Sequence, residues 1–147
     1  TMTVTISESI TLNGKNQGGT QTLSIPSIAT VSRRIIDVPA SEVEILAMST
    51  AVAAGTFIES DVLYIRITNL DDTNHVTLLF KNENNDEFAV KLDKGQTFIY
   101  NGDLSGGVVD TMDADSSALS VSLGDLVNVT ATADTAACDV EVFVACK

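Results

Sequence analysis

The sequence is poor in the residues that build metal sites, redox sites and aromatic binding platforms. Its 147 residues include one histidine, two cysteines, two prolines, five phenylalanines, two tyrosines and no tryptophan. A cupin-type metal site needs several histidines, so this chain cannot assemble one. The scarcity of aromatic residues also counts against a sugar-binding platform, because such platforms stack the sugar on aromatic rings.

Basic residues are scarce as well. Eight lysines and arginines stand against 20 aspartates and glutamates, for a net charge of −12. Nucleic acids and anionic membranes bind cationic patches, and the only basic doublet, Arg33-Arg34, lies inside an apolar run. We therefore expect no nucleic-acid partner and no membrane partner. Solubility, a salty environment or a basic protein partner could each explain the acidity, and solubility is favoured.

Long hydrophobic runs are missing too. The run Ile45 to Ile58 has 14 uncharged residues but is diluted by serine, threonine and glycine, so it is too short and too polar to span a bilayer. The first ten residues lack the basic and apolar regions of a secretory signal. We expect a protein made in a cytoplasm.

The two cysteines, Cys138 and Cys146, are predicted to lie on one strand. Eight residues of strand place them on the same face, roughly 26 Å apart, whereas a disulfide needs Cα atoms within about 7 Å. Their spacing is also wrong for a zinc site. The prediction is two small, apolar, buried thiols.

Alternation of apolar and polar residues is the main positive signal. Ten to twelve strand candidates follow one another at the spacing of an antiparallel sandwich, with no convincing long helix. We expect one domain over residues 1–147, an all-β, antiparallel β-sandwich of jelly-roll-like form with about ten strands. Residues 1–26 are expected to form an N-terminal strand or arm of that domain.

The first strand is predicted over Met2–Leu12. Val4, Ile6, Ile10 and Leu12 share one parity and should face inward, with Glu8 interrupting them. The turn formers of residues 13–19 should then reverse the chain. Further strands are predicted at 22–25, before Pro26, and at 28–38, where Arg33 and Arg34 should project to opposite faces.

Residues 41–54 allow two interpretations. Ser41 and Glu44 form a capping-box pair, and Val43, Ala47, Ala51 and Ala54 have near-helical spacing. Alternation over 42–48 indicates a strand instead. We favour the strand, because a lone helix would be out of character in a β-rich chain.

The clearest pattern is an antiparallel meander over residues 62–100. Its four strands are predicted at 62–68, 75–81, 87–93 and 97–100, separated by the polar turns NLDDTN, NENND and DKG. The inner faces should hold Leu63, Ile65 and Ile67, then Val76, Leu78 and Phe80, then Phe88, Val90 and Leu92. After a loop with a short strand at 104–115, strands are predicted at 118–123, 126–133 and 138–145.

No catalytic, cofactor-binding or metal-binding residue emerges from the sequence. His75 begins a strand after a turn and is interpreted as a solvated edge residue, and no serine lies in a G-x-S-x-G context. The acidic turns at 71–74, 82–87 and 110–115 offer oxygen ligands for calcium, but none has EF-hand spacing. Asp and Asn are also common in turns for backbone reasons. We predict no enzymatic activity and no cofactor.

Three segments resemble small β-rich virion proteins of marine tailed bacteriophages. They are Tyr64–Asp71 (YIRITNLD) with the alternating run to Phe80, Lys91–Phe98 (KLDKGQTF), and Cys138–Ala145 (CDVEVFVA). The likeness covers about half of the chain and rests on pattern, so no functional residue is carried over by position. It implies a jelly-roll subunit of the virion that decorates or cements the capsid.

The resemblance also implies protein partners. These are the major capsid protein or other virion proteins. We also expect a homo-oligomer, with a trimer favoured if the protein sits on a capsid symmetry axis. The alternative is a fibre, spike or host-glycan-binding module of the virion. Open strand edges at the N-terminus or at 42–48 could pair with a neighbour by β-augmentation.

Overall fold

The computed structural model describes residues 1–102 and 124–147, and this part of the chain is all-β. It forms thirteen strands and one 3-10 turn, η1 (Glu59–Asp61). The strands are β1 (Met2–Ser7), β2 (Thr11–Leu12), β3 (Lys15–Asn16), β4 (Thr20–Ile25), β5 (Thr30–Val38), β6 (Val43–Ser49), β7 (Phe57–Ile58), β8 (Val62–Asn69), β9 (Val76–Asn82), β10 (Glu87–Leu92), β11 (Thr97–Asn101), β12 (Leu126–Ala133) and β13 (Cys138–Cys146). The predicted all-β class is confirmed. The expected segments at 104–115 and 118–123 lie outside the described residues.

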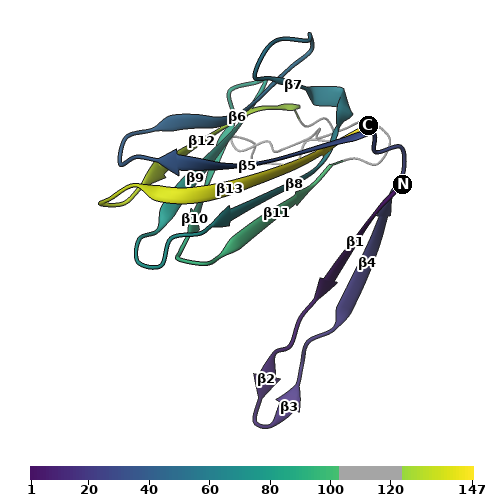
Figure 1. Ribbon diagram of the computed structural model, residues 1–147, viewed down its shortest axis with the longest axis vertical. Coiled ribbons are helices and arrows are strands. Elements are labelled where there is room, and N and C mark those ends of the chain that lie inside the picture. Colours follow the sequence, from purple (N-terminus) through teal and green to yellow (C-terminus); the bar gives the residue numbers. More distant parts are fainter. Residues whose placement is uncertain (103–123) are drawn as a thin grey trace, which may run out of the picture.

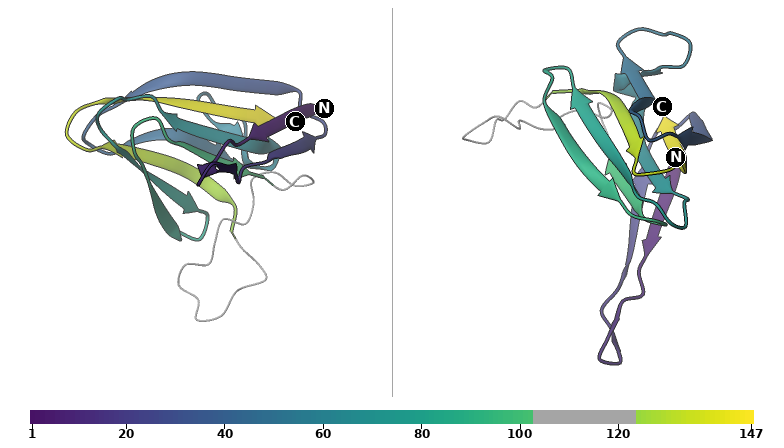
Figure 2. Two further views of the ribbon diagram at one scale, coloured as in Figure 1. Left: turned by 90° about the horizontal axis from the view of Figure 1, so that it is seen from below. Right: turned by 90° about the vertical axis from the view of Figure 1, so that its left-hand side faces the viewer.

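Two main sheets form a sandwich-like body (Figures 1 and 2). The five-stranded sheet has the order β10-β9-β12-β6-β7, and the four-stranded sheet has the order β11-β8-β13-β5. Every pairing is antiparallel except that of the short β7 with β6. Strands far apart in sequence are therefore neighbours, because β13 lies between β8 and β5. The finer jelly-roll description stays a prediction.

The meander predicted over residues 62–100 is wrong as a topology, although its four strands form almost where expected. Of these four strands, only β9 and β10 pair with each other as neighbours in sequence. The first and last, β8 and β11, pair with each other in the opposite sheet. The turns after β8 and after β10 carry the chain from one sheet to the other. Both sheets bury one face, so the same alternation suits a strand in either sheet.

Phe80 joins the two sheets in the core. Its fully buried ring stacks on Phe88 of the same sheet at a centroid distance of 4.7 Å. It also meets Phe98 and Tyr100 of β11, in the opposite sheet, at 5.1 and 6.1 Å. Burying aromatic rings contributes strongly to core stability. The predicted inner faces of β9 and β10 are thereby confirmed.

The predicted inner face of β8 is only partly correct. Ile65 and Ile67 belong to the core between the sheets, but Leu63 is buried in a second, smaller cluster. The register between β13 and β8 shifts between Ala145 and Cys146. Such a bulge changes which side chains face inward, and Val62 takes the core position instead.

Three further strand predictions are confirmed. Residues 126–133 form β12 and residues 138–146 form β13. The ambiguous segment after Ser41 is the strand β6, not a helix. The buried Ile45, Leu46 and Met48 hold it against the core.

Residues 1–26 form a hairpin arm that leaves the sandwich at the end where both termini lie (Figure 1). β1 pairs with β4, and the two-residue strands β2 and β3 close the tip around Asn13 and Gly14. Both turn residues have positive φ, at 52° and 75°, which Asn-Gly tolerates in a tight hairpin turn. The predicted chain reversal over 13–19 is confirmed.

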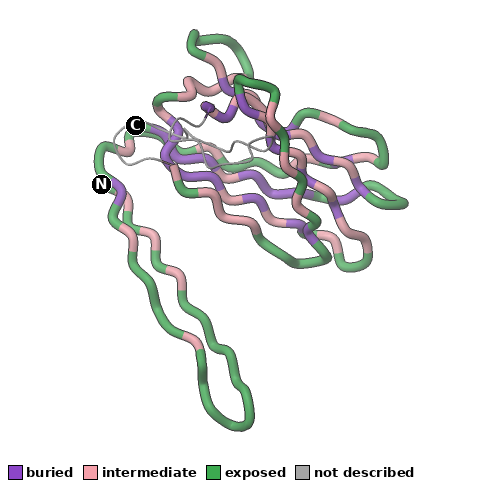
Figure 3. The backbone as a smooth tube through the Cα atoms, turned by 180° about the vertical axis from the view of Figure 1, so that it is seen from behind, coloured by how far each residue is buried: buried purple, intermediate pink, exposed green. Residues whose placement is uncertain are grey.

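The predicted inward face of Met2–Leu12 is wrong beyond Ile6. Met2 and Val4 pack against the sandwich, but Ile10 and Leu12 are exposed near the arm tip (Figure 3). Apolar alternation shows that a strand has two unlike faces. It does not show that a second layer covers the apolar one.

Candidate functional site

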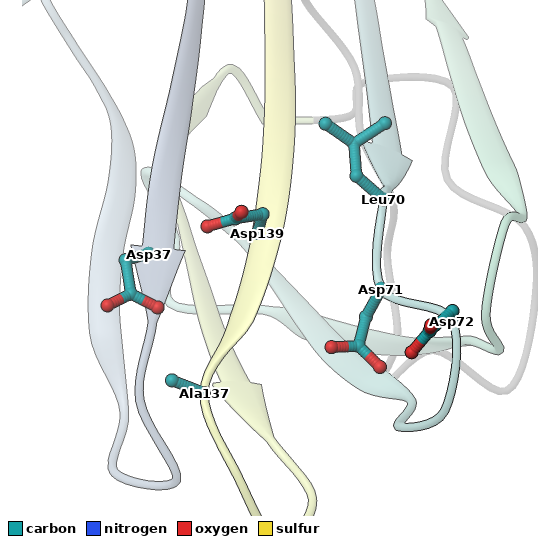
Figure 4. Close-up of a pocket in the computed structure, with 6 residues that line it drawn as sticks. All are labelled: Asp37, Leu70, Asp71, Asp72, Ala137 and Asp139. Carbon is teal, nitrogen blue, oxygen red and sulfur yellow. The ribbon is translucent and has the colours of Figure 1, made fainter.

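An open depression of about 470 Å³ lies at one end of the sandwich (Figure 4). Its lining comes from the end of β5, the start of β13 and the turn after β8, and consists of Asp37, Leu70, Asp71, Asp72, Ala137 and Asp139. Asp37 and Asp139 are directly opposite each other across the β5–β13 pair. Like charges at such positions repel, so this end of the molecule has a strong negative field.

The carboxylates of this depression are not arranged as a metal site. Figure 4 shows them spread along its lining and not converging on one point. Backbone N–H donors of Asn74 and Thr73 lower the pKa of Asp71, so that side chain organises its own turn. Within residues 1–102 and 124–147, no group of three or more His, Cys, Asp or Glu side chains could hold a metal ion.

Two of the three turns that offered calcium ligands in the sequence are built around a buried asparagine. Asn69 donates through Nδ2 to the carbonyls of Asn74 and Leu92 at 3.0 and 3.2 Å, and its Oδ1 accepts from the Asp71 N–H. Asn82 Oδ1 accepts from the N–H groups of Asn84 and Asp86 at 3.0 and 2.9 Å. The two asparagine side chains therefore hold the backbone of these two turns in place. The turn at 110–115 lies outside the described residues.

His75 lies at the same acidic end, just before β9. Its Nδ1 is 3.6 Å from Asp134 Oδ2, beyond good hydrogen-bond distance, and its side chain is partly exposed. The partial exposure agrees with the interpretation of His75 as a solvated residue, but β9 lies between β10 and β12 and is not an edge strand. The geometry provides no nucleophile–base pair involving His75 among the contacts of the described chain.

The two cysteines occupy the two ends of β13, and both are buried and free. Burial and, secondarily, the nearby Asp61 carboxylate raise the pKa of Cys146 to about 11. Burial is also the main cause that raises the pKa of Cys138. Thiols held in the protonated form are poor nucleophiles and poor metal ligands, so the predicted structural role is supported.

The outer face of the four-stranded sheet holds an ion-pair network that the sequence did not reveal. Glu141 accepts hydrogen bonds from Arg33 Nε and from Arg66 Nη2, both at 3.0 Å. Burial tends to raise the pKa of Glu141, but the bonds to the two guanidinium groups outweigh it and lower the pKa. The Arg66 guanidinium also lies 4.9 Å from the centre of the Phe143 ring. The sequence signal for this network was a glutamate, Glu141, among the valines of the strand predicted at 138–145.

The two adjacent arginines project to opposite faces, as predicted. Arg33 joins this outer network, whereas Arg34 Nη2 donates to the Ile45 carbonyl at 2.8 Å and links β5 to β6. The outer face therefore carries Arg33 and Arg66, two positive charges on a strongly acidic protein.

The base of the arm packs on the same outer face. Ile25 forms a small cluster with Leu63, Tyr64 and Ala145, and the arm adds Met2, Val4 and Leu23 to it. The opposite face of the arm is a ladder of hydroxyl residues, where Thr3, Thr5 and Ser7 stand across from Ser24, Thr22 and Thr20. Past this anchor the arm is largely exposed (Figure 3), which makes it a second candidate for binding.

Comparison of the chain with models of known protein families, with curated proteins and with solved structures finds no match in any of the three. The described residues include no helix with the length and apolar character needed to cross a membrane.

Proposed function

We propose that this protein is a structural subunit of a virion, which binds the outer shell of a tailed phage as a capsid decoration (cement) protein. The observation that supports it best is the hairpin arm, which projects from the sandwich and exposes Ile10 and Leu12 near its tip (Figure 1). A two-stranded hairpin is marginally stable by itself in water. An arm of this kind gains stability when another protein surface covers it.

The distribution of charge supports a protein partner. Glu8 and Lys15 are the only charged side chains in residues 1–25, and they cancel, so the net charge of −12 belongs to the rest of the chain. A neutral arm can bind a neighbour while the acidic sandwich stays in solvent. The major capsid protein is the proposed partner, with other virion proteins next.

A co-sedimentation experiment tests this function. Purified protein is mixed with capsids assembled without it, and the mixture is separated on a density gradient. We expect the full chain to sediment with the capsids and the arm-tip variant I10S/L12S to bind at least about tenfold more weakly, because the two lost side chains are apolar and exposed. Failure of the full chain to sediment with capsids would overturn the proposal.

A second candidate is a fibre, spike or host-glycan-binding module of the virion. The acidic depression favours it, because carboxylates such as Asp37 and Asp139 accept hydrogen bonds from sugar hydroxyls. No aromatic residue lines the depression, which ranks this candidate second. Binding on a glycan array that is lost in D139N would reverse the order.

A further inference from the structure

We infer that the arm tip of one copy binds a second copy of this chain, on the outer surface of strand β5. The proposed function gives the same arm to a capsid partner, so this self-association concerns the free chain and is tested without capsids. It joins two exposed surfaces of the same chain that its own fold leaves uncovered.

The donor surface is the arm tip. Ile10 and Leu12 are 49% and 63% exposed there, and Figures 1 and 3 show the tip well clear of the sandwich. Ten residues separate Met2 from Leu12, a span of about 33 Å in extended chain. The tip therefore reaches outward to a neighbour and not back onto its own sandwich.

The acceptor surface is the β5 patch, defined here as Val31, Arg33 and Ile35. These alternate residues face outward on a nine-residue edge strand of the four-stranded sheet, and both aliphatic side chains are 59% exposed. Natural edge strands of this length are normally charged or covered, because they invite pairing. The arm tip and the β5 patch hold four of the six large apolar side chains that are exposed in the described chain.

Charge favours a second copy as the occupant. The arm carries one carboxylate, Glu8, close to its apolar tip residues, and the β5 patch carries Arg33, whose side chain is 67% exposed although it binds Glu141. The neutral arm adds no repulsion against an acidic neighbour. A basic partner would instead be attracted by the carboxylates at the far end of the sandwich.

The contact is head-to-tail, because donor and acceptor are different surfaces. Heterologous contacts close into rings when the rotation between copies allows it. A ring of three copies is one such closed form, and it matches the trimer favoured for a subunit on a capsid symmetry axis. Each copy then gives one arm and receives one.

Three variants measured by light scattering after size exclusion test the inference. I10S/L12S removes the donor, V31S/I35S removes the acceptor, and V52S alters a more exposed valine elsewhere, at 85% exposure. We expect oligomers for the wild type and for V52S. Each double variant should show at least a tenfold higher dissociation constant. Thermal unfolding should be unchanged at concentrations where the wild type is monomeric, because all four side chains are exposed.

Mixing the two double variants decides between modes of association. One variant retains the acceptor and the other retains the donor, so a dimer should reappear in the mixture. A monomeric mixture, a monomeric wild type at about 100 µM, or oligomers of V31S/I35S would each overturn the inference. The last result would indicate pairing between arms.

A glycine pair in the arm adds an independent test. A Cβ at Gly18 would lie 2.1 Å from the Glu8 carbonyl oxygen, whereas one at Gly19 meets nothing within 4 Å. G18A should therefore distort the arm and weaken association at least about tenfold, and G19A should not. Equal behaviour of the two variants would contradict a role for the arm.

Discussion

At the scale of single residues, Glu141 is the most informative side chain. It is 8% exposed and lies between two arginines on the outer face of the four-stranded sheet. A buried carboxylate without partners would be costly, so Arg33 and Arg66 account for its presence in a strand of valines. They also keep two positive charges on an otherwise acidic protein.

The variant E141Q should lower the free energy of unfolding by about 1–2 kcal/mol at pH 7, because it loses two charge-assisted hydrogen bonds that are partly exposed. The folded state lowers the pKa of Glu141, so its contribution is present above the ordinary carboxyl pKa and is lost as the pH falls through the lowered value. Urea unfolding of both proteins between pH 3 and 8 measures this. If the difference in unfolding free energy between the wild type and E141Q does not shrink below about pH 4.5, the result would count against the network.

Cys146 should be unreactive in the folded protein. Its pKa of about 11 reduces the thiolate fraction at pH 8 about a hundredfold relative to an ordinary thiol. Titration with a thiol reagent should detect slow labelling of C138S in buffer and fast labelling in denaturant. Fast labelling of folded C138S would show that Cys146 is accessible.

At the scale of elements, the turns after β8 and β9 share one design. Each strand ends in a buried asparagine, Asn69 or Asn82, and that side chain bonds the turn that follows. The turn after β8 also carries the chain between the two sheets. An acidic turn sequence here reflects backbone organisation and not a metal loop.

Replacing Asn69 by alanine should lower the free energy of unfolding by about 2–3 kcal/mol, because the buried carbonyl of Leu92 and the N–H of Asp71 lose their partners. Chemical unfolding measures the change. The control is T73A at the exposed part of the same turn, which should stay within about 0.5 kcal/mol. A loss no larger for N69A than for T73A would mean that the turn does not depend on Asn69.

At the scale of the whole molecule, charge and apolar surface are segregated. The sandwich carries the net charge of −12, and the arm is neutral and apolar near its tip. Four carboxylates gather at one end, with Asp37 opposite Asp139. Repulsion within such a surface opposes folding and keeps sandwiches apart.

Salt should therefore stabilise the protein. Screening lengths fall to about 10 Å at 0.1 M ionic strength, so the melting temperature should rise between 10 and 200 mM NaCl. D37N removes one member of the opposed pair and should gain about 0.5 kcal/mol at low salt, with the gain fading at high salt. Thermal unfolding across this range measures both effects, and a melting temperature that falls with added salt would contradict them.

The sequence alone determined where most strands lie and which of their residues are buried. Alternation is a local property with a two-residue period, so β9, β10, β12 and β13 could be predicted closely. The bulge that moves Leu63 out of the main core could not be predicted, because it depends on the register with β13.

Only the tertiary structure decided which strands are neighbours and what the apolar residues meet. It divided the predicted meander between two sheets and left Ile10 and Leu12 on an arm in solvent. It also brought Glu141 to Arg33 and Arg66, which lie 108 and 75 residues away. These outcomes depend on hydrogen bonds between distant strands and on the paths of the connecting turns, which a local pattern of side chains does not encode.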